Sequence, residues 1–244
     1  MIGAGERALF SREGDPRTVL SAEAVVFDCD GLLVDSESVW MELIAAWLPR
    51  DEASRPVRLE GFRGLGVDDA ARRLADLLGR PWTSAGIQEE LVERYSALLA
   101  DGVRPMPGAV ELVRSLSGRM PLAVASNGLR TDVLAMLDDV GILEMVDVVR
   151  TLDDVSAGKP APDLYLAAAA ALGVSPDRAV AFEDSPAGAH AAGAAGMTVI
   201  GVNADHAVEL DCTLRMRRLS ELARDHQRNP QVAPAASRLK TDPL

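Results

Sequence analysis

Two aspartates follow an apolar run near the start of the chain. Asp28 and Asp30 come after Ala24–Phe27, a run that is typical of a buried β-strand. On an extended chain, residues two apart point to the same side, so these two carboxylates converge. Converging carboxylates repel each other unless a cation lies between them, and oxygen ligands of this kind suit Mg²⁺. A strand end followed by a solvated turn explains the segment equally well, because Asp and Gly are common in turns.

Three further segments carry groups that could act together with these carboxylates. Ser126 and Asn127 follow a second apolar run and offer a hydroxyl and backbone N–H groups at the start of a helix, which suits an anion. Glu183 and Asp184 form a second carboxylate pair at the end of a later run. Lys159 is one of only two lysines in a chain that otherwise uses arginine. Ligands of a doubly wound sheet bind at the carboxyl ends of its strands, so we expect these groups to meet.

Apolar runs rich in β-formers alternate with helical patterns along the chain. The runs predicted as strands are 24–27, 122–125, 146–149, 179–182 and 198–202. The segments predicted as helices between them are 108–117, 131–140, 162–172 and 187–195. This alternation is typical of βαβ units, so we expect an α/β fold with a doubly wound parallel-sheet (Rossmann-like) core.

A long gap, from Asp28 to Leu122, separates the first predicted strand from the second. The gap is helical in period and contains no strand run, and a single crossover needs far less chain. We therefore expect an inserted all-helical cap domain. The predicted boundaries are a polar N-terminal extension over 1–20, the core over 21–36 and 102–226, the helical cap over 37–101 and a flexible C-terminal tail over 227–244.

The composition excludes several classes of protein. The formal net charge is −12, from 37 acidic and 25 basic residues, so we expect no binding to nucleic acid or to an anionic membrane. No apolar run is long enough to span a bilayer, and no signal or transit peptide is visible. Cys29 and Cys212 are too few for a disulfide scaffold and favour reduced thiols in a cytoplasm. We expect a cytoplasmic monomer, with a weak dimer left open.

The chemistry-bearing segments together resemble the haloacid dehalogenase-like (HAD) superfamily. The matching segments are Phe27–Glu37, Ser126–Asn127, Gly158–Asp163 and Phe182–Gly188. The likeness extends over residues 21–225, and the helical insertion looks like the small cap that follows the first motif in that family. The first and fourth segments are specific to the family, whereas the Ser126 segment alone would mean little.

The resemblance implies a role for each acidic residue. Asp28 would be the nucleophile that forms an aspartyl-phosphate, and Asp30 would act first as the acid and then as the base. Mg²⁺ would be held by the Asp28 side chain, the Asp30 backbone carbonyl and Asp184. Glu183 is a further candidate ligand. The metal would shield the anionic nucleophile from the anionic phosphate.

The resemblance also implies how the phosphate is held. Ser126 and Lys159 would bind the phosphoryl oxygens, assisted by the backbone N–H of Asn127. A lysine suits this task because it is a compact charge on a long stem. Arg63, in the insertion, is a candidate contact to the substrate, although a solvent-facing arginine explains it equally well.

Departures from the family's branches narrow the reaction. The dehalogenating branch lacks the aspartate that stands here as Asp30. The phosphonate-cleaving branch uses a cap lysine, and residues 37–101 contain none. The β-phosphoglucomutase branch carries a histidine where this chain has Trp40 and an arginine where it has Val67. Both departures favour a hydrolase that handles one phosphate.

The sequence therefore predicts a Mg²⁺-dependent phosphatase, a phosphoric monoester hydrolase that acts on a small phosphorylated metabolite. A sugar phosphate is the favoured substrate. A phosphomutase that uses a bisphosphate intermediate is the first alternative. A phosphoacceptor signalling module is the alternative from another class, but Asp30 and the cap argue against it. A signalling module of this kind has no leaving group that Asp30 would need to protonate, and no substrate that a cap would need to enclose.

Overall fold

The protein forms two compact units, of which one comprises Met1–Val34 and Arg104–Leu244 and the other Asp35–Val103. The structure is a computed structural model that describes residues 8–12, 15–48, 59, 61–62, 67–79 and 83–222. Two parts of the predictions, Arg63 and the tail over 227–244, lie outside these residues. No helix in the described part of the chain is long and apolar enough to cross a membrane.

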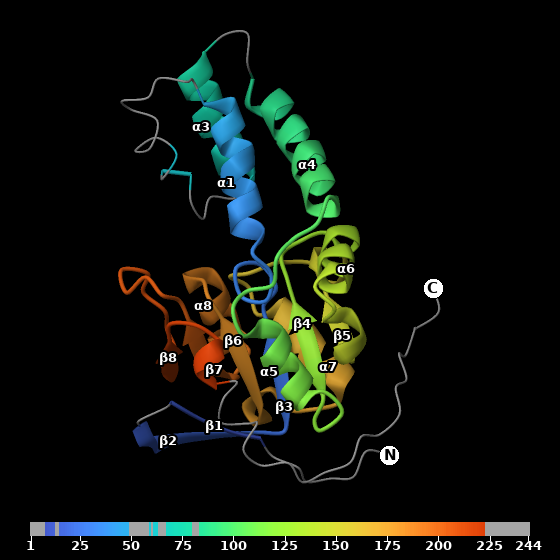
Figure 1. The fold of residues 1–244 in the computed structure, drawn as a ribbon, viewed down its shortest axis with the longest axis vertical. Coiled ribbons are helices and arrows are strands. Elements are labelled where there is room, and N and C mark those ends of the chain that lie inside the picture. Colours follow the sequence, from blue (N-terminus) through green and yellow to red (C-terminus); the bar gives the residue numbers. More distant parts are fainter. Residues whose placement is uncertain are drawn as a thin grey trace. The chain divides into compact units, whose positions relative to one another are not determined.

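A six-stranded parallel sheet forms the centre of the first unit (Figure 1). Its strands are β3 (Ala24–Phe27), β4 (Leu122–Ala125), β5 (Val148–Arg150), β6 (Ala179–Glu183), β7 (Thr198–Val202) and β8 (Leu214–Met216). The order across the sheet is β5-β4-β3-β6-β7-β8, and every neighbouring pair is parallel. Strand β3 therefore lies between β4 and β6. All the residues of these three strands are buried, as in a sheet covered on both faces.

In the described part of the first unit, four helices alternate with the strands of the sheet along the chain. They are α5 (Ala109–Leu116), α6 (Arg130–Asp139), α7 (Asp163–Leu172) and α8 (Pro186–Ala194). Helix α7 packs against β3, β4 and β5, and α8 packs against β6 and β7. Short 3₁₀ turns lie at Leu143–Met145, Leu152–Asp154 and Pro176–Arg178. The predicted α/β fold with a parallel sheet is confirmed.

Two strand regions differ from the sequence-based expectation. A β-hairpin of β1 (Ala8–Arg12) and β2 (Asp15–Ala22) lies largely in the segment 1–20, which the sequence predicts only as a polar extension. Strand β2 begins with Asp15 and Pro16, residue types that are depleted in strands, so the sequence pattern does not indicate a strand there. Strand β8 was not predicted either, because three residues are too few to show a period.

The second unit is built from α1 (Ser36–Trp47), α3 (Val67–Leu78) and α4 (Ser84–Ala100). Helix α4 packs against both α1 and α3 around an apolar cluster. Trp40 belongs to this cluster: its ring meets the ring of Tyr95 edge-on at 5.4 Å, and its Nε1 donates to the carbonyl of Phe62 at 3.4 Å. Val67 is the first residue of α3 and packs against the same cluster. Trp40 is therefore a core residue of the helical unit.

Candidate active site

The ends of β3, β4 and β6 bring the predicted polar residues to one edge of the sheet. Phe27 is in register with Val124 of β4 and with Phe182 of β6. Asp28 and Ser126 follow their strands directly, and Glu183 ends β6. The backbone N–H of Asp28 donates to the carbonyl of Phe182 at 3.0 Å, which ties the end of β3 to β6. The polar groups therefore gather because parallel strands end together.

Lys159 lies at the centre of this group. Its side chain is only 5% exposed, and its Nζ forms ion pairs with Oδ1 of Asp28 and, at 2.7 Å, with Oε1 of Glu183. Burial lowers the pKa of Lys159, but the negative charges of Asp28 and Glu183 raise it more, so the net pKa lies well above the ordinary value. The ammonium is therefore charged and is shared between two carboxylates.

The loop that carries Lys159 is held by the side chain of Asn127. The Asn127 Oδ1 accepts from the backbone N–H of Lys159 at 2.8 Å, and its Nδ2 donates to the Lys159 carbonyl at 3.2 Å. Gly158 allows this approach, because a Cβ there would lie 2.6 Å from the Asn127 Oδ1. The sequence predicted only a backbone contribution from Asn127. A side-chain amide can donate and accept at once, which lets it pair with a whole peptide unit.

Asp30 is held by Ser126. The fully buried Ser126 Oγ donates to Oδ2 of Asp30 at 2.8 Å and accepts from the backbone N–H of Gly128 at 2.9 Å. The turn that follows Asp30 needs glycine, because Gly31 has a φ of 78° in the left-handed region. A Cβ at Gly31 would also overlap Oδ2 of Asp184. The turn after β3 and the loop after β6 thus approach each other closely.

Glu183 is completely buried, and both of its oxygens accept hydrogen bonds. Oε1 accepts from Lys159 Nζ at 2.7 Å and from the Tyr165 hydroxyl at 2.5 Å. Oε2 accepts from the backbone N–H groups of Asp184 at 3.2 Å and Ser185 at 3.3 Å, and from Ser185 Oγ at 3.1 Å. Five donors, one of them the Lys159 cation, explain how a carboxylate remains inside this apolar sheet.

The negative charges of Asp28 and Asp184 are less well compensated than that of Glu183. Burial raises the pKa of Asp28 well above its ordinary value, and the opposing charge of Lys159 does not offset this. Burial, together with the negative charge of Glu183, raises the pKa of Asp184 to about 7. No side chain in the described part of the chain donates to the Asp184 carboxylate, whereas Asn203 Nδ2 donates to its backbone carbonyl at 2.9 Å.

These three acidic residues form a cluster that could hold a metal ion. One carboxylate oxygen each of Asp28, Glu183 and Asp184 lie within 4.8 Å of one another. The raised pKa values of Asp28 and Asp184 reflect buried negative charge that the protein compensates only in part. Hard oxygen donors and uncompensated charge together fit a divalent cation.

The structure therefore brings together almost all of the predicted site residues. Those that meet at the strand ends are Asp28, Asp30, Ser126, Asn127, Lys159, Glu183 and Asp184. Two further residues that contact this group, Tyr165 and Asn203, are not predicted from the sequence. Tyr165 carries a usable signal: after Asp163 the other residues of helix α7 are all Leu or Ala, and a tyrosine buried among them needs a partner for its hydroxyl.

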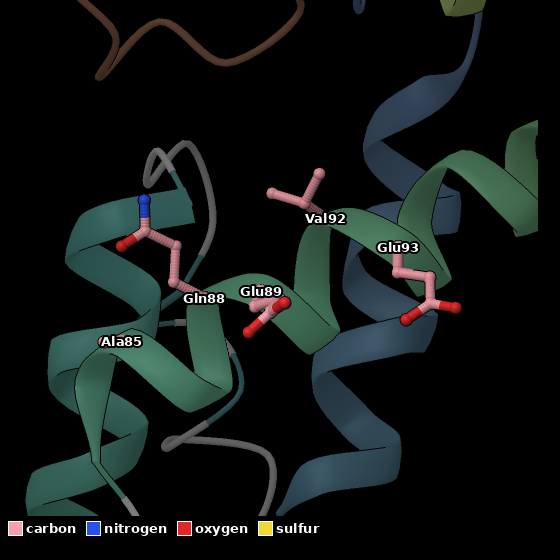
Figure 2. A pocket seen from close by; sticks show the side chains of 5 residues that line it. All are labelled: Ala85, Gln88, Glu89, Val92 and Glu93. Carbon is pink, nitrogen blue, oxygen red and sulfur yellow. The ribbon is translucent and has the colours of Figure 1, made fainter.

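A separate hollow in the helical unit has no such chemistry. Ala85, Gln88, Glu89, Val92 and Glu93 line it, and all five lie along α4 (Figure 2). Their spacing of three and four residues places them on one face of the helix. All five residues are exposed, as is typical of the outer face of a surface helix.

Comparisons with known proteins agree with this geometry. Residues 22–196 match the family of haloacid dehalogenase-like hydrolases. A validoxylamine A 7'-phosphate phosphatase of Streptomyces hygroscopicus subsp. limoneus is 33% identical over 230 residues, which cover 87% of this chain and 99% of that protein. A fructose-1-phosphate phosphatase of Escherichia coli (strain K12) is 31% identical over 182 residues, covering 73% and 95%. The crystal structure of CbbY from Rhodobacter sphaeroides in complex with phosphate matches with a TM-score of 0.64 at 28% identity, covering 82% and 96%.

Proposed function

The chain belongs to the haloacid dehalogenase-like hydrolases and is a phosphoric monoester hydrolase, and from this premise we propose that it removes phosphate from a small phosphorylated sugar or polyol with Asp28 as the nucleophile and Mg²⁺ as the cofactor. The observation that carries the proposal is the meeting of Asp28, Lys159 and Asp184 at the end of β3. A nucleophilic carboxylate, a buried cation and a further carboxylate are the groups that attack on a phosphomonoester requires.

The residues that would hold Mg²⁺ are the Asp28 side chain, the backbone carbonyl of Asp30 and the Asp184 carboxylate. Glu183 lies in the same cluster, but both of its oxygens already accept hydrogen bonds, so we assign it to Lys159 and not to the metal. When bound, the cation neutralises negative charge between the nucleophile and the phosphate. The net charge of −12 makes such local positive charge necessary for an anionic substrate.

In the first half of the reaction, a carboxylate oxygen of Asp28 forms a bond to phosphorus and the phosphorus–oxygen bond to the sugar breaks. Asp30 gives its proton to the leaving sugar oxygen. Lys159 binds a phosphoryl oxygen, where negative charge is concentrated. The products of this half are the free alcohol and an aspartyl-phosphate on Asp28.

In the second half, water forms a bond to phosphorus and gives a proton to Asp30, while the bond between phosphorus and Asp28 breaks. Inorganic phosphate leaves, and Asp28 and Asp30 return to their starting states. Ser126 supports this step because its hydroxyl, 2.8 Å from Oδ2 of Asp30, fixes the orientation of that carboxyl group. The same residue thus serves as acid and then as base.

The substrate class is supported by the relatives. Two curated relatives are named for a validoxylamine A 7'-phosphate and for fructose 1-phosphate, and the second of these is a sugar phosphate. Trp40 and Val67 stand where the family resemblance places the histidine and arginine of the mutase branch, and Trp40 is packed into a core. This favours transfer of the phosphoryl group to water over its return to a sugar.

The test is phosphate release from a panel of sugar and polyol phosphates, measured with Mg²⁺ and again after removal of divalent metal by EDTA. We expect release with Mg²⁺ and none without it, and we expect Asp28→Asn to be inactive. If β-glucose 1-phosphate is isomerised with a bisphosphate primer and no ester is hydrolysed, the proposal is wrong. Phosphorylation by acetyl phosphate that persists for minutes without turnover would point to a signalling module.

A further inference from the structure

The hydroxyl of Tyr165 has no part in the mechanism above, yet it lies beside the reacting groups. Tyr165 is the third residue of α7 and is completely buried, with its ring in the apolar cluster between α7, α8 and the sheet. Its hydroxyl donates to Oε1 of Glu183 at 2.5 Å. Burial raises the pKa of this phenol well above its ordinary value, so the hydroxyl keeps its proton and remains a donor. The side chain therefore reaches from the core to the site.

The oxygen that Tyr165 contacts also binds Lys159. Oε1 of Glu183 receives Nζ of Lys159 at 2.7 Å, and the same Nζ forms an ion pair with Asp28. Nζ also lies 5.1 Å from the centroid of the Tyr165 ring, within the range of a cation–π contact. Tyr165 thus contacts the catalytic lysine through its ring and the carboxylate that anchors this lysine through its hydroxyl.

The ammonium group of lysine has three N–H donors. Asp28 and Glu183 take two of them here, and the positions of these two acceptors determine the direction of the third. In the proposed function, the third donor is the one that meets a phosphoryl oxygen. A small shift of Glu183 would therefore change how Lys159 faces both the nucleophile and the substrate.

We propose that Tyr165 is a positioning residue for Lys159: by holding Oε1 of Glu183, its hydroxyl fixes the direction in which Lys159 presents its ammonium group to Asp28 and to the phosphoryl group. The inference rests on the proposed function, because it concerns the same site. Tyr165 itself touches neither the nucleophile nor the substrate in this account and acts through Glu183 and Lys159.

Packing alone does not explain the hydroxyl. Phe27 and Phe182 are stacked in the same sheet at 5.2 Å between ring centroids and are completely buried, so an aromatic ring packed on this sheet does not require a hydroxyl. Burying a phenol instead is unfavourable unless its hydroxyl is bonded. Without the Tyr165 hydroxyl, Oε1 of Glu183 would keep only one donor, Lys159, and would draw the ammonium away from Asp28. A hydrogen bond to a charged group is strong enough to change a rate by tenfold to about a hundredfold.

The chain offers a matched pair of variants, because it contains only two tyrosines. Tyr165→Phe removes the hydroxyl that donates to Glu183. Tyr95→Phe removes a hydroxyl that donates to the backbone carbonyl of Ser36 at 3.2 Å in the helical unit. Each full-length variant is compared with wild type, in Mg²⁺, for kcat, KM, the inhibition constant of orthovanadate and the thermal midpoint.

We expect Tyr165→Phe to lower kcat/KM by about tenfold or more and to weaken vanadate inhibition by a similar factor, while Tyr95→Phe changes both by less than about twofold. The inhibition constant is a property of each folded site and does not depend on the fraction of enzyme that folds. If vanadate inhibition and kcat/KM stay within twofold of wild type, or if Tyr165→Phe does not fold, the hydroxyl serves the core and the proposal is wrong. Failure of the proposed function would show in wild type itself, as absence of phosphate release.

Discussion

Two pairs of acidic residues lie at the ends of neighbouring strands, and their surroundings make them different. After β3, Asp28 pairs with the side chain of Lys159 and Asp30 accepts from that of Ser126, one partner each among the described residues. At the end of β6, Glu183 accepts five hydrogen bonds and is completely buried.

Its neighbour Asp184 has no side-chain donor to its carboxylate in the described part of the chain, and burial raises its pKa to about 7. Asp184 therefore keeps oxygens for a cation, whereas Glu183 serves as the counter-charge of Lys159. The contrast shows that hydrogen bonding and burial, and not residue type, assign the role of a carboxylate at this edge. Substitutions on the two sides of this contrast should therefore have different effects.

The largest effect is expected at the β3 end. Asp28→Asn keeps the shape of the side chain but removes the charged oxygen that we propose attacks phosphorus, so kcat should fall by about 10⁴-fold or more. Steady-state phosphate release measures the loss, and the thermal midpoint checks folding. Asp211→Asn, at an exposed position, is the matched control and should leave kcat unchanged. Turnover above a hundredth of wild type in Asp28→Asn would exclude Asp28 as the nucleophile.

The next effect separates the two members of the β6 pair. Asp184→Asn should raise the Mg²⁺ concentration for half-maximal activity on the order of a hundredfold, because it removes a proposed metal ligand. Glu183→Gln should change this concentration much less, but should lower the free energy of unfolding by about 3–5 kcal/mol because it leaves Lys159 poorly compensated. Metal titrations measure the Mg²⁺ requirement of each variant, and urea unfolding measures its free energy of unfolding. A greater metal requirement in Glu183→Gln than in Asp184→Asn would reverse the assignment.

A smaller effect is expected from the helix that follows the β6 pair. A Cβ at Gly188 would overlap the Glu183 carboxylate, whereas a Cβ at Gly193 of the same helix would meet nothing within 4 Å. Gly188→Ala should therefore destabilise the protein by about 1–3 kcal/mol. Gly193→Ala should be neutral or stabilising by up to about 1 kcal/mol, because alanine favours a helix. Equal midpoints of urea unfolding for the two variants would show that Glu183 does not need this space.

The smallest effect concerns pH. A carboxyl whose pKa is higher in the folded than in the unfolded protein favours folding at low pH, and this contribution is lost as pH rises through the folded pKa. For Asp184 that pKa is about 7, so without metal the thermal midpoint of wild type minus that of Asp184→Asn should fall between pH 5 and pH 8. Mg²⁺ should stabilise wild type more at pH 8 than at pH 5. A metal-free difference that increases with pH would contradict the sign of this shift.

The fold was predictable because its signals are local. Apolar runs such as Leu122–Ala125 and the long gap without a strand are visible in a short window of sequence, and they predict the parallel sheet and the helical insertion. Strand β2 is not predicted from the sequence, because Asp15 and Pro16 at its start are residue types that rarely occur in strands. The scarcity of lysine pointed to Lys159, and the structure places its Nζ between two carboxylates.

Other features of the site could not be predicted because they depend on contacts between distant residues. Glu183 and Asp184 are equivalent in the sequence, and only the packing of Tyr165 and Lys159 onto one of them makes them differ. The pairing of Asn127 with the Lys159 backbone joins residues 32 positions apart. No local pattern encodes such a contact, because it exists only when the strands have assembled.

The most direct test of the central claim is to trap the covalent intermediate. Enzyme quenched during turnover and treated with borohydride should contain homoserine in place of Asp28, because borohydride reduces an acyl phosphate to the alcohol. Peptide mass spectrometry locates the change, and the same treatment without substrate is the control. Homoserine at position 28, and at no other aspartate or glutamate, is the predicted result. Reduction at another acidic residue, or none while phosphate is being released, would contradict Asp28 as the nucleophile.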